Sequence, residues 1–136
     1  MTLVLTPSLR TKLESQALAA YPREACGLLV GKSECHGRVH DVWSLPNRVA
    51  DNPESSFAMD PGELVAALGR AEAAGLEQVG FWHSHPDAAA IPSARDRAAA
   101  WPDSLQLIAS IGARGLVELR GWRMDPSGPI EEGLVT

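Results

Sequence analysis

Two histidines near the middle of the chain have the residue type and spacing of metal ligands. His83 and His85 are two residues apart at the end of an apolar run, so on a strand both would point to the same face and reach one ion. Pro86 lacks a backbone donor and ends the strand, which places the pair at the edge of a sheet. Imidazole nitrogens and a carboxylate oxygen suit zinc, and three protein ligands leave the fourth position open, as catalytic zinc requires. The spacing therefore predicts a catalytic zinc site.

We expect the third ligand to be Asp96, which lies in the first turn of the next predicted helix, with Ser93 three residues earlier on the same helical face. Ser93-x-x-Asp96 is also close to a capping box, which needs no metal. The two interpretations are compatible, because a capping serine can still present its hydroxyl to a ligand. Asp87 is the alternative carboxylate, but it adjoins Pro86 and is more typical of a solvated loop.

The composition of the 136 residues is that of one globular domain spanning 1–136, at 45% hydrophobic and 21% charged. The net charge of −5 argues against a nucleic-acid surface. The first ten residues do not resemble a signal peptide, and no apolar run is long enough for a membrane span. Two cysteines, Cys26 and Cys35, form no disulfide framework, so we expect a cytoplasmic protein with reduced thiols. Cys26 lies in an apolar run and reads as core filling, not as a nucleophile.

The elements that must position these residues are strands interrupted by three helices. Apolar residues at every third or fourth position, with caps and stop signals, predict helices over 7–20, 60–74 and 93–100. Short apolar or alternating runs predict strands over 3–5, 26–30, 38–45, 57–59, 78–83, 105–111, 116–123 and 130–135. In the second helix we expect Leu64, Val65 and Leu68 to point inward. This order predicts an α/β or α+β sandwich with a mixed sheet.

The motif around these ligands resembles the signature of the JAMM (MPN-plus) metalloprotease family. The stretch from His83 to Asp96 matches H-x-H-P-x₆-S-x-x-D. Residues 24–31 resemble the E-x-x-G-x-L-x-G strand of that family, and residues 47–61 resemble the connecting segment of its bacterial members. The chain is too short for the insertions with which eukaryotic members grip ubiquitin chains, so it resembles the compact prokaryotic branch.

The resemblance implies a role for each matching residue. His83, His85 and Asp96 would hold one zinc ion per chain, Glu24 would be the general acid/base, and Ser93 would donate to the developing oxyanion. From the residues alone, Glu24 reads as an exposed strand-end glutamate. With the motif present, a carboxylate that activates water is needed, and no glutamate lies between Glu77 and Glu118.

The resemblance also implies a fold and a substrate class. The fold would be a mixed sheet flanked by helices, similar to that of cytidine deaminases. The reaction would be hydrolysis of the amide bond after the C-terminal Gly-Gly of a ubiquitin-like or sulfur-carrier protein, which is the partner we expect, with neither nucleic acid nor membrane involved.

Three other enzyme classes share some of these residues, and each requires a feature that this chain lacks. Zinc deaminases need H-x-E with P-C-x-x-C, H-x-H amidohydrolases need barrels of roughly 250 residues, and a cupin would need a histidine after His85. The alternative outside catalysis is a zinc-bearing scaffold that binds a ubiquitin-like partner without cutting it, against which the intact Glu24 and Ser93 argue. The ligand types favour zinc, although two histidines and one aspartate also suit iron and other divalent ions.

Overall fold

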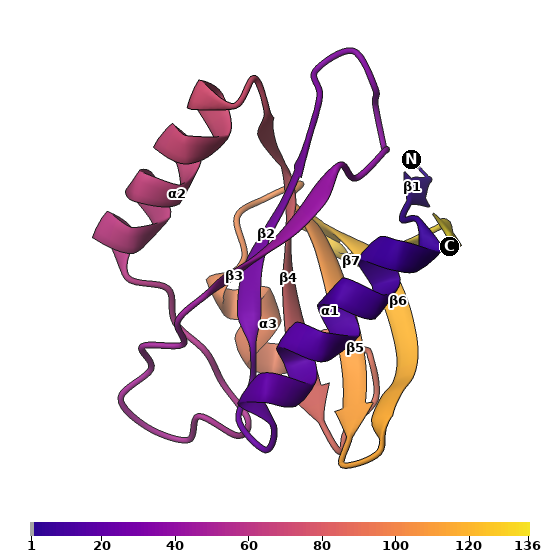
Figure 1. Cartoon of the computed structure of the whole chain (residues 1–136). Coiled ribbons are helices and arrows are strands. Elements are labelled where there is room, and N and C mark those ends of the chain that lie inside the picture. The colour runs from indigo at the N-terminus through magenta and orange to yellow at the C-terminus, as the bar shows by residue number, and fades with distance from the viewer. Residues whose placement is uncertain (1) are drawn as a thin grey trace.

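The fold is built on a six-stranded mixed sheet (Figure 1). The computed structural model describes residues 2–136, so Met1, the first residue of the predicted domain, lies outside the described residues. The strand order is β3-β2-β4-β5-β6-β7, and β4 and β5 are the one parallel pair among these described strands. Their bounds are β2 Cys26–Gly31, β3 Asp41–Leu45, β4 Glu77–Pro86, β5 Leu105–Gly112, β6 Gly115–Asp125 and β7 Gly128–Glu132. The predicted mixed sheet is confirmed.

Two short strands near the chain ends form a separate pair. Strand β1 (Leu3–Val4) pairs in parallel with β8 (Leu134–Val135), which brings the two ends of the chain together (Figure 1). The predicted strand over 130–135 is therefore two strands, β7 in the large sheet and β8 in the small one, separated by Gly133.

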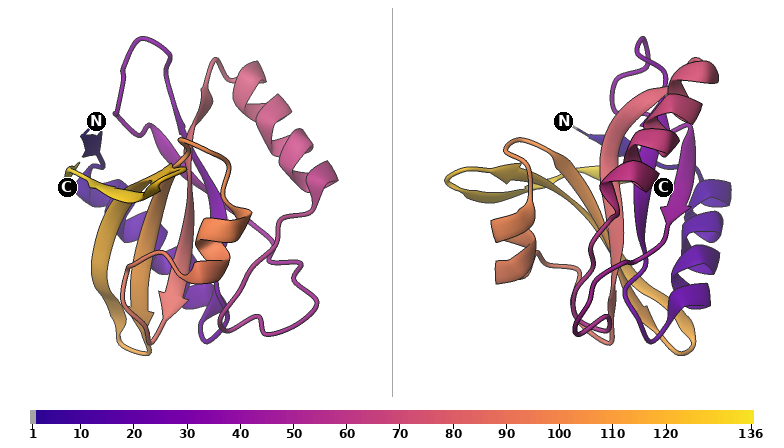
Figure 2. Two further views of the ribbon diagram at one scale, coloured as in Figure 1. Left: turned by 180° about the vertical axis from the view of Figure 1, so that it is seen from behind. Right: turned by 90° about the vertical axis from the view of Figure 1, so that its left-hand side faces the viewer.

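Helix α1 (Pro7–Ala20) covers one face of the sheet, as both views in Figure 2 show. Thr6 caps its first turn by accepting a hydrogen bond from the Leu9 backbone N–H, and Pro7 occupies the first helical position. Leu13 and Ala17 are fully buried against sheet residues that include Trp82. The alternation of β4 therefore assigns Trp82 to the α1 face and its two histidines to the opposite face.

Helices α2 (Pro61–Ala73) and α3 (Ala94–Ala99) lie on that opposite face. In α2 the fully buried positions are Ala67 and Ala71, which pack with Leu28 and Val30 of β2. The prediction that Val65 and Leu68 point inward was wrong, because 68% of Val65 is exposed and Leu68 is also on the surface. Small alanine side chains allow the helix to approach the sheet closely. Leu64 is partly buried beside the same cluster.

Two further strand predictions differ from the structure. Strand β3 begins at Asp41, so residues 38–40 precede it. Val39 donates its backbone N–H to the carbonyl of Val4, and His40 donates its backbone N–H to the carbonyl of Val30. Residues 57–59 form no strand. The side chain of Asn47 accepts the Ala58 N–H at 3.1 Å, and Arg48 donates its backbone N–H to the Ala58 carbonyl at 2.8 Å. This segment is therefore held as a loop, and it forms one wall of the site described next. None of the described helices is long and apolar enough to cross a membrane.

Candidate metal centre

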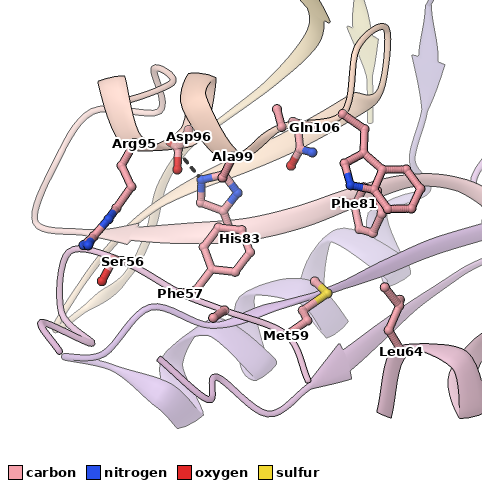
Figure 3. A pocket seen from close by; sticks show the side chains of 13 residues that line it. Ser56, Phe57, Met59, Leu64, Phe81, His83, Arg95, Asp96, Ala99 and Gln106 are labelled. Carbon is pink, nitrogen blue, oxygen red and sulfur yellow. Dashed lines mark hydrogen bonds and ion pairs between the residues drawn. The ribbon is translucent and has the colours of Figure 1, made fainter. Parts of the chain in front are cut away.

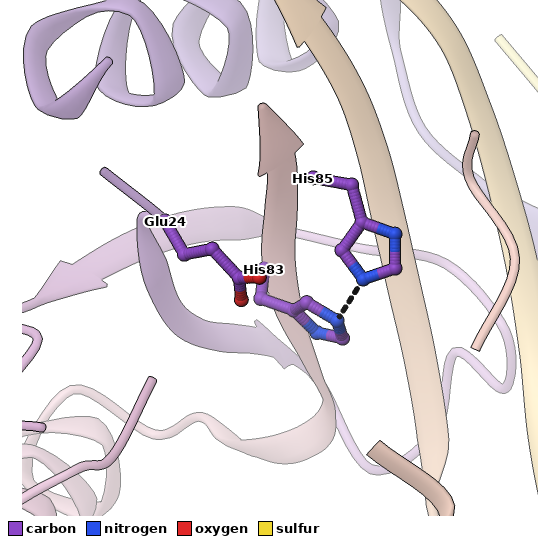
Figure 4. Close-up of side chains that lie close together, drawn as sticks. All are labelled: Glu24, His83 and His85. Carbon is purple, nitrogen blue, oxygen red and sulfur yellow. Dashed lines mark hydrogen bonds between the residues drawn. The ribbon is translucent and has the colours of Figure 1, made fainter. Parts of the chain in front are cut away.

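The two histidines project from the last residues of β4 toward the start of β2. Because side chains two apart share a face of a strand, His83 and His85 point the same way, while Ser84 points to the other face. Strand β2 pairs antiparallel with β4 with Cys26 opposite His83, so Glu24, two residues before Cys26, lies opposite His85. Figure 4 shows the side chains of His83 and His85 from β4 and that of Glu24 from the segment before β2 lying close together.

Three potential ligand atoms form a small triangle. His83 Nε2 lies 3.1 Å from His85 Nε2 and 3.2 Å from Asp96 Oδ2, and His85 Nε2 lies 3.0 Å from the same Asp96 oxygen. Two atoms bound to one tetrahedral zinc ion at ordinary bond lengths lie about 3.3 Å apart. The triangle therefore has nearly the dimensions that a shared ion requires. The sequence motif correctly predicted that these three side chains meet.

Asp96 reaches this triangle because α3 starts with a capping box. The Ser93 hydroxyl accepts the Asp96 backbone N–H at 3.0 Å, and Asp96 Oδ2 accepts the Ser93 backbone N–H at 2.9 Å. The capping interpretation of Ser93 is thus confirmed. Since the hydroxyl oxygen accepts this bond, its proton is free to be donated elsewhere, and the side chain is exposed beside the triangle.

Glu24 is a buried carboxylate next to the histidines. Only 4% of the residue is exposed, so the expectation of an exposed strand-end glutamate was wrong. One carboxylate oxygen of Glu24, one ring nitrogen of His83 and one of His85 all lie within 4.8 Å of one another. Among residues 2–136, Glu24 Oε1 has no hydrogen-bond partner. Burial raises the pKa of Glu24 to about 7, with the charge of His85 opposing that rise.

The backbone of Glu24 is fixed by three neighbours. Its N–H donates to the carbonyl of Pro53 at 2.7 Å, and its carbonyl accepts from the Asn47 side chain at 3.1 Å. The N–H of the next residue, Ala25, donates to the Ser84 hydroxyl at 2.8 Å. The carboxylate therefore sits on a rigid support although the chain around it is irregular.

The second nitrogens of the two histidine rings differ. His85 Nδ1 lies 2.7 Å from the carbonyl oxygen of Ala89, the kind of partner that orients a metal-binding histidine. His83 Nδ1 is buried and has no hydrogen-bond partner among the described residues.

The protonation states follow from burial and from Asp96. Burial lowers the pKa of His83, which favours the neutral ring. Burial acts in the same direction on His85, but the hydrogen bonds to Asp96 and to the Ala89 carbonyl outweigh it and raise the pKa of His85. Burial alone would raise the pKa of Asp96, yet its bonds to the two histidines hold it well below its usual range. Asp96 is therefore an anion facing two imidazoles, which is the donor set of a divalent cation.

These residues fit a zinc ion on structural grounds. Two ring nitrogens and one carboxylate oxygen converge at suitable separations, and the buried Glu24 oxygen beside them lacks a partner. A cation at the triangle would satisfy the negative charge of Asp96 and stabilise the ionised form of Glu24.

A pocket of about 310 Å³ opens beside His83 and Asp96 (Figure 3). Phe57 forms part of its wall and stacks on His83, with ring centroids 4.7 Å apart. The remaining lining is mostly apolar and comes from the 56–59 loop, α2, β4, α3 with the two residues after it, and β5: Ser56, Ala58, Met59, Leu64, Phe81, Arg95, Ala99, Ala100, Trp101 and Gln106.

Other candidate residues lie outside the triangle. Asp87 is an exposed loop residue that accepts a hydrogen bond from the Tyr21 hydroxyl at 2.7 Å, as its loop assignment predicts. Cys26 is fully buried, and burial raises the pKa of its thiol to about 12, which is the state of a core cysteine and not of a nucleophile. His36 and His40 are exposed, in a loop and not in a strand.

Sequence reasoning missed two supporting residues. Asn47 was noted only as the start of a family-like segment, yet its amide bonds both the Glu24 and the Ser56 carbonyls, at 3.1 and 3.0 Å. An asparagine directly after a strand is a signal for such local backbone bonding. The second is Ser84, and no sequence signal indicates that its hydroxyl would accept the Ala25 N–H.

Comparison with known proteins places the chain in a family. Residues 6–125 match the model of the prokaryotic homologs of the JAB domain. Because that match takes in most of the chain, the protein belongs to this family, and the family membership predicted from the motif is confirmed.

Relatives within the curated proteins include two enzymes of prokaryotes. The chain is 41% identical over 94 residues to a desampylase of Haloferax volcanii, a match that covers 68% of this chain and 66%, just under two thirds, of that protein. It is 31% identical over 118 residues to a probable TtuB-protein conjugate cleaving protease of Thermus thermophilus, covering 86% of this chain and 76% of that protein.

Solved structures share the fold. A solution structure of a Desulfitobacterium hafniense protein has a TM-score of 0.86 at 32% identity and covers 99% of this chain and 92% of that one. A JAB1/MPN domain protein from Archaeoglobus fulgidus has a TM-score of 0.57 at 17% identity and covers both chains completely, at 100% each. The second likeness shows the fold alone.

Proposed function

We propose that this protein is a zinc-dependent isopeptidase that hydrolyses the amide bond after the C-terminal Gly-Gly of a ubiquitin-like or sulfur-carrier protein. The observation that carries the proposal is the triangle of His83, His85 and Asp96 atoms, 3.0 to 3.2 Å apart, beside the buried carboxylate of Glu24. The conjugate-cleaving relatives support the same reaction class. A single domain over 1–136 would carry it.

In the proposed mechanism, His83, His85 and Asp96 would hold one zinc ion, which would supply the Lewis acidity that polarises a carbonyl and makes water more acidic. Glu24 takes the proton from the attacking water and delivers it to the leaving amine. The buried Glu24 carboxylate has an oxygen without a hydrogen-bond partner among residues 2–136, which can accept this proton and return it. The Ser93 hydroxyl donates a hydrogen bond to the oxyanion that develops on the substrate carbonyl.

The substrate tail would lie along residues 48–57, next to the pocket whose wall includes Ser56 and Phe57. An extended tail can gain main-chain hydrogen bonds along an exposed backbone segment. The two glycines are needed because a side chain beside the ligands would prevent the scissile carbonyl from reaching them. The apolar pocket then accommodates a larger side chain farther from the cut.

The two free cysteines, Cys26 and Cys35, support a cytoplasmic location, because such thiols persist in a reducing compartment. Nothing in the proposed reaction calls for nucleic acid or for a membrane.

The test is a cleavage assay on a defined conjugate. A ubiquitin-like protein that ends in Gly-Gly and is joined through its last glycine to a lysine amine is incubated with zinc-loaded protein, and the products are identified by mass spectrometry. We expect one cut directly after the last glycine, and no cut when the penultimate glycine is replaced by leucine. A scaffold would bind the conjugate and leave it whole, and a general peptidase would cut unrelated unfolded proteins with equal efficiency. Either result contradicts the proposal.

A further inference from the structure

Among the buried polar atoms without partners near the proposed zinc site, two have complementary chemistry. Among residues 2–136, the buried side-chain atoms without a hydrogen-bond partner are His83 Nδ1, Gln106 Oε1, Glu24 Oε1 and Gln16 Oε1. The first two belong to side chains that line the same pocket. Unsatisfied buried polar atoms are uncommon in native proteins. A ring nitrogen that can donate and an amide oxygen that can accept, both unpaired in one pocket, therefore indicate that they can bond to each other.

The sheet register explains why these side chains are neighbours. Strands β4 and β5 run in parallel with Phe81 opposite Gln106 and His83 opposite Ile108. Gln106 is therefore one diagonal step from His83 on the same face of the sheet. Figure 3 shows its amide beside the His83 ring, in the same pocket. Only 1% of His83 and 8% of Gln106 are exposed, so water has little access to either atom.

Metal binding decides which nitrogen of His83 carries the proton. Nε2 is the atom that faces His85 and Asp96, so an ion there leaves the proton on Nδ1. A ligating histidine normally donates that second N–H to an oxygen acceptor, as His85 does to the Ala89 carbonyl. His83 Nδ1 has no such partner among the described residues, and the Gln106 amide oxygen is an unpaired acceptor one diagonal step away on the same face of the sheet.

The amide of Gln106 is already oriented for this contact. Its Nε2 donates to the Ser104 hydroxyl at 3.4 Å, which directs Oε1 away from Ser104.

We propose that Gln106 is a positioning residue that accepts the Nδ1–H of His83 and holds this ring in its metal-binding orientation. The inference rests on the proposed function, because it assumes that His83 binds the ion through Nε2. A neutral amide suits this place, because it fixes the ring without adding another negative charge beside Asp96 and Glu24. Without the acceptor, the ring could turn about its Cβ–Cγ bond, and Nε2 would leave the triangle.

The first experiment measures zinc affinity by competition with a chromogenic chelator. Gln106→Met removes the acceptor and keeps an unbranched side chain, and we expect its affinity for zinc to fall about 10-fold to 100-fold, the usual effect of losing such a partner. Gln106→Glu keeps an acceptor oxygen and should bind zinc within a few-fold of the wild type. Gln16→Met is the matched control, because Gln16 also has an unpaired buried amide oxygen but lies on α1, on the other face of the sheet.

The second experiment observes the ring proton directly. In the zinc-loaded wild type, the His83 Nδ1–H should give a slowly exchanging NMR signal, as should the His85 Nδ1–H. In Gln106→Met the His83 signal should exchange faster, while the His85 signal stays unchanged as the internal reference. A purely structural role for Gln106 would not separate the two histidines in this way.

The outcomes distinguish this inference from the proposed function. If the wild type binds no zinc, the metal site itself is wrong. If the wild type binds zinc and folded Gln106→Met binds it equally tightly, Gln106 is not the partner of His83. If folded Gln106→Glu is as weak as Gln106→Met, the loss reflects packing, and the inference is overturned as well.

Discussion

Ser93 and Asp96 hold one another through reciprocal hydrogen bonds, from the Asp96 N–H to the Ser93 hydroxyl at 3.0 Å and from the Ser93 N–H to Asp96 Oδ2 at 2.9 Å. That same Oδ2 also faces both histidines. The helix cap and the metal-facing carboxylate are therefore one structure. A change at Ser93 affects helix stability and chemistry together, and experiments must separate the two.

Ser93→Ala should keep zinc and lose activity mainly in kcat. The hydroxyl bonds an oxyanion that exists only after attack, so its loss should lower kcat by roughly 10²- to 10³-fold, as for one oxyanion-hole donor, with a smaller change in KM. The free energy of unfolding should also fall by about 1 kcal/mol through the lost cap. Steady-state kinetics and thermal unfolding of the same preparation measure both effects.

Thr6→Ala provides the control for the cap, because Thr6 caps α1 on the far face of the sheet. It should cost a similar free energy of unfolding and leave kcat unchanged. If Ser93→Ala loses no more activity than Thr6→Ala, the oxyanion role of Ser93 is wrong.

Glu24→Gln should keep one zinc ion and lose at least about a hundredfold in rate, the usual contribution of a positioned acid/base. The amide has nearly the same shape as the carboxyl group, so the backbone bonds to Pro53 and Asn47 should persist. Single-turnover cleavage of the Gly-Gly conjugate is the measurement. Near-normal turnover would remove Glu24 from the mechanism.

The stability of the metal-free protein should depend on pH through Glu24. Burial raises its pKa from 4.5 to about 7, so the folded state favours the neutral carboxyl. This contribution is fully present below pH 4.5 and is lost as the pH rises through 7, where a buried charge remains. Glu24→Gln stays neutral, so with a chelator present it should exceed the wild type in unfolding free energy by about 1 to 3 kcal/mol at pH 8.

At pH 4 the same two proteins should be nearly equal in stability. His83, His85 and Asp96 titrate in both, so their effects largely cancel in the difference. Denaturant unfolding at both pH values tests this, and a difference of the same size at pH 4 and pH 8 would show that the Glu24 pKa is not raised.

The loop over 48–53 should affect substrate binding and not zinc. Arg48 forms two hydrogen bonds with Glu63 of α2, at 3.0 and 2.9 Å, which hold the loop beside the pocket. Arg48→Ala should raise KM only about twofold to fivefold, because an exposed ion pair contributes little. Lys12→Ala, which breaks the exposed Lys12–Asp41 pair on the α1 side, is the control and should leave KM unchanged. A rise in KM in both variants would point to a general loss of structure.

Most of the fold could be predicted from local patterns, because short sequence signals determine where helices begin and end. Thr6 and Pro7 set the start of α1, and Asp60 with Pro61 sets that of α2. The errors arose where tertiary contacts decide. Residues 57–59 have the composition of a strand, but the side chain of Asn47 binds their backbone and keeps them a loop.

The convergence of His83, His85 and Asp96 could be predicted because residues at this spacing share one face of a strand and the start of the next helix. The environment of Glu24 could not, since its burial depends on residues 46–58 folding over it. Gln106 could not be found either. Its place beside His83 follows from the parallel register of β4 and β5, which no local pattern specifies.

The most direct test of the zinc site is the metal content of the purified protein, measured by inductively coupled plasma mass spectrometry. The wild type should contain about one zinc ion per chain, and His83→Ala, His85→Ala and Asp96→Ala should each be nearly empty while remaining folded. Asp87→Ala, which removes the nearby carboxylate that lies outside the triangle, should keep the wild-type content. Zinc content unchanged in the three ligand variants, or lost on changing Asp87 and kept on changing Asp96, would contradict the assignment of the site.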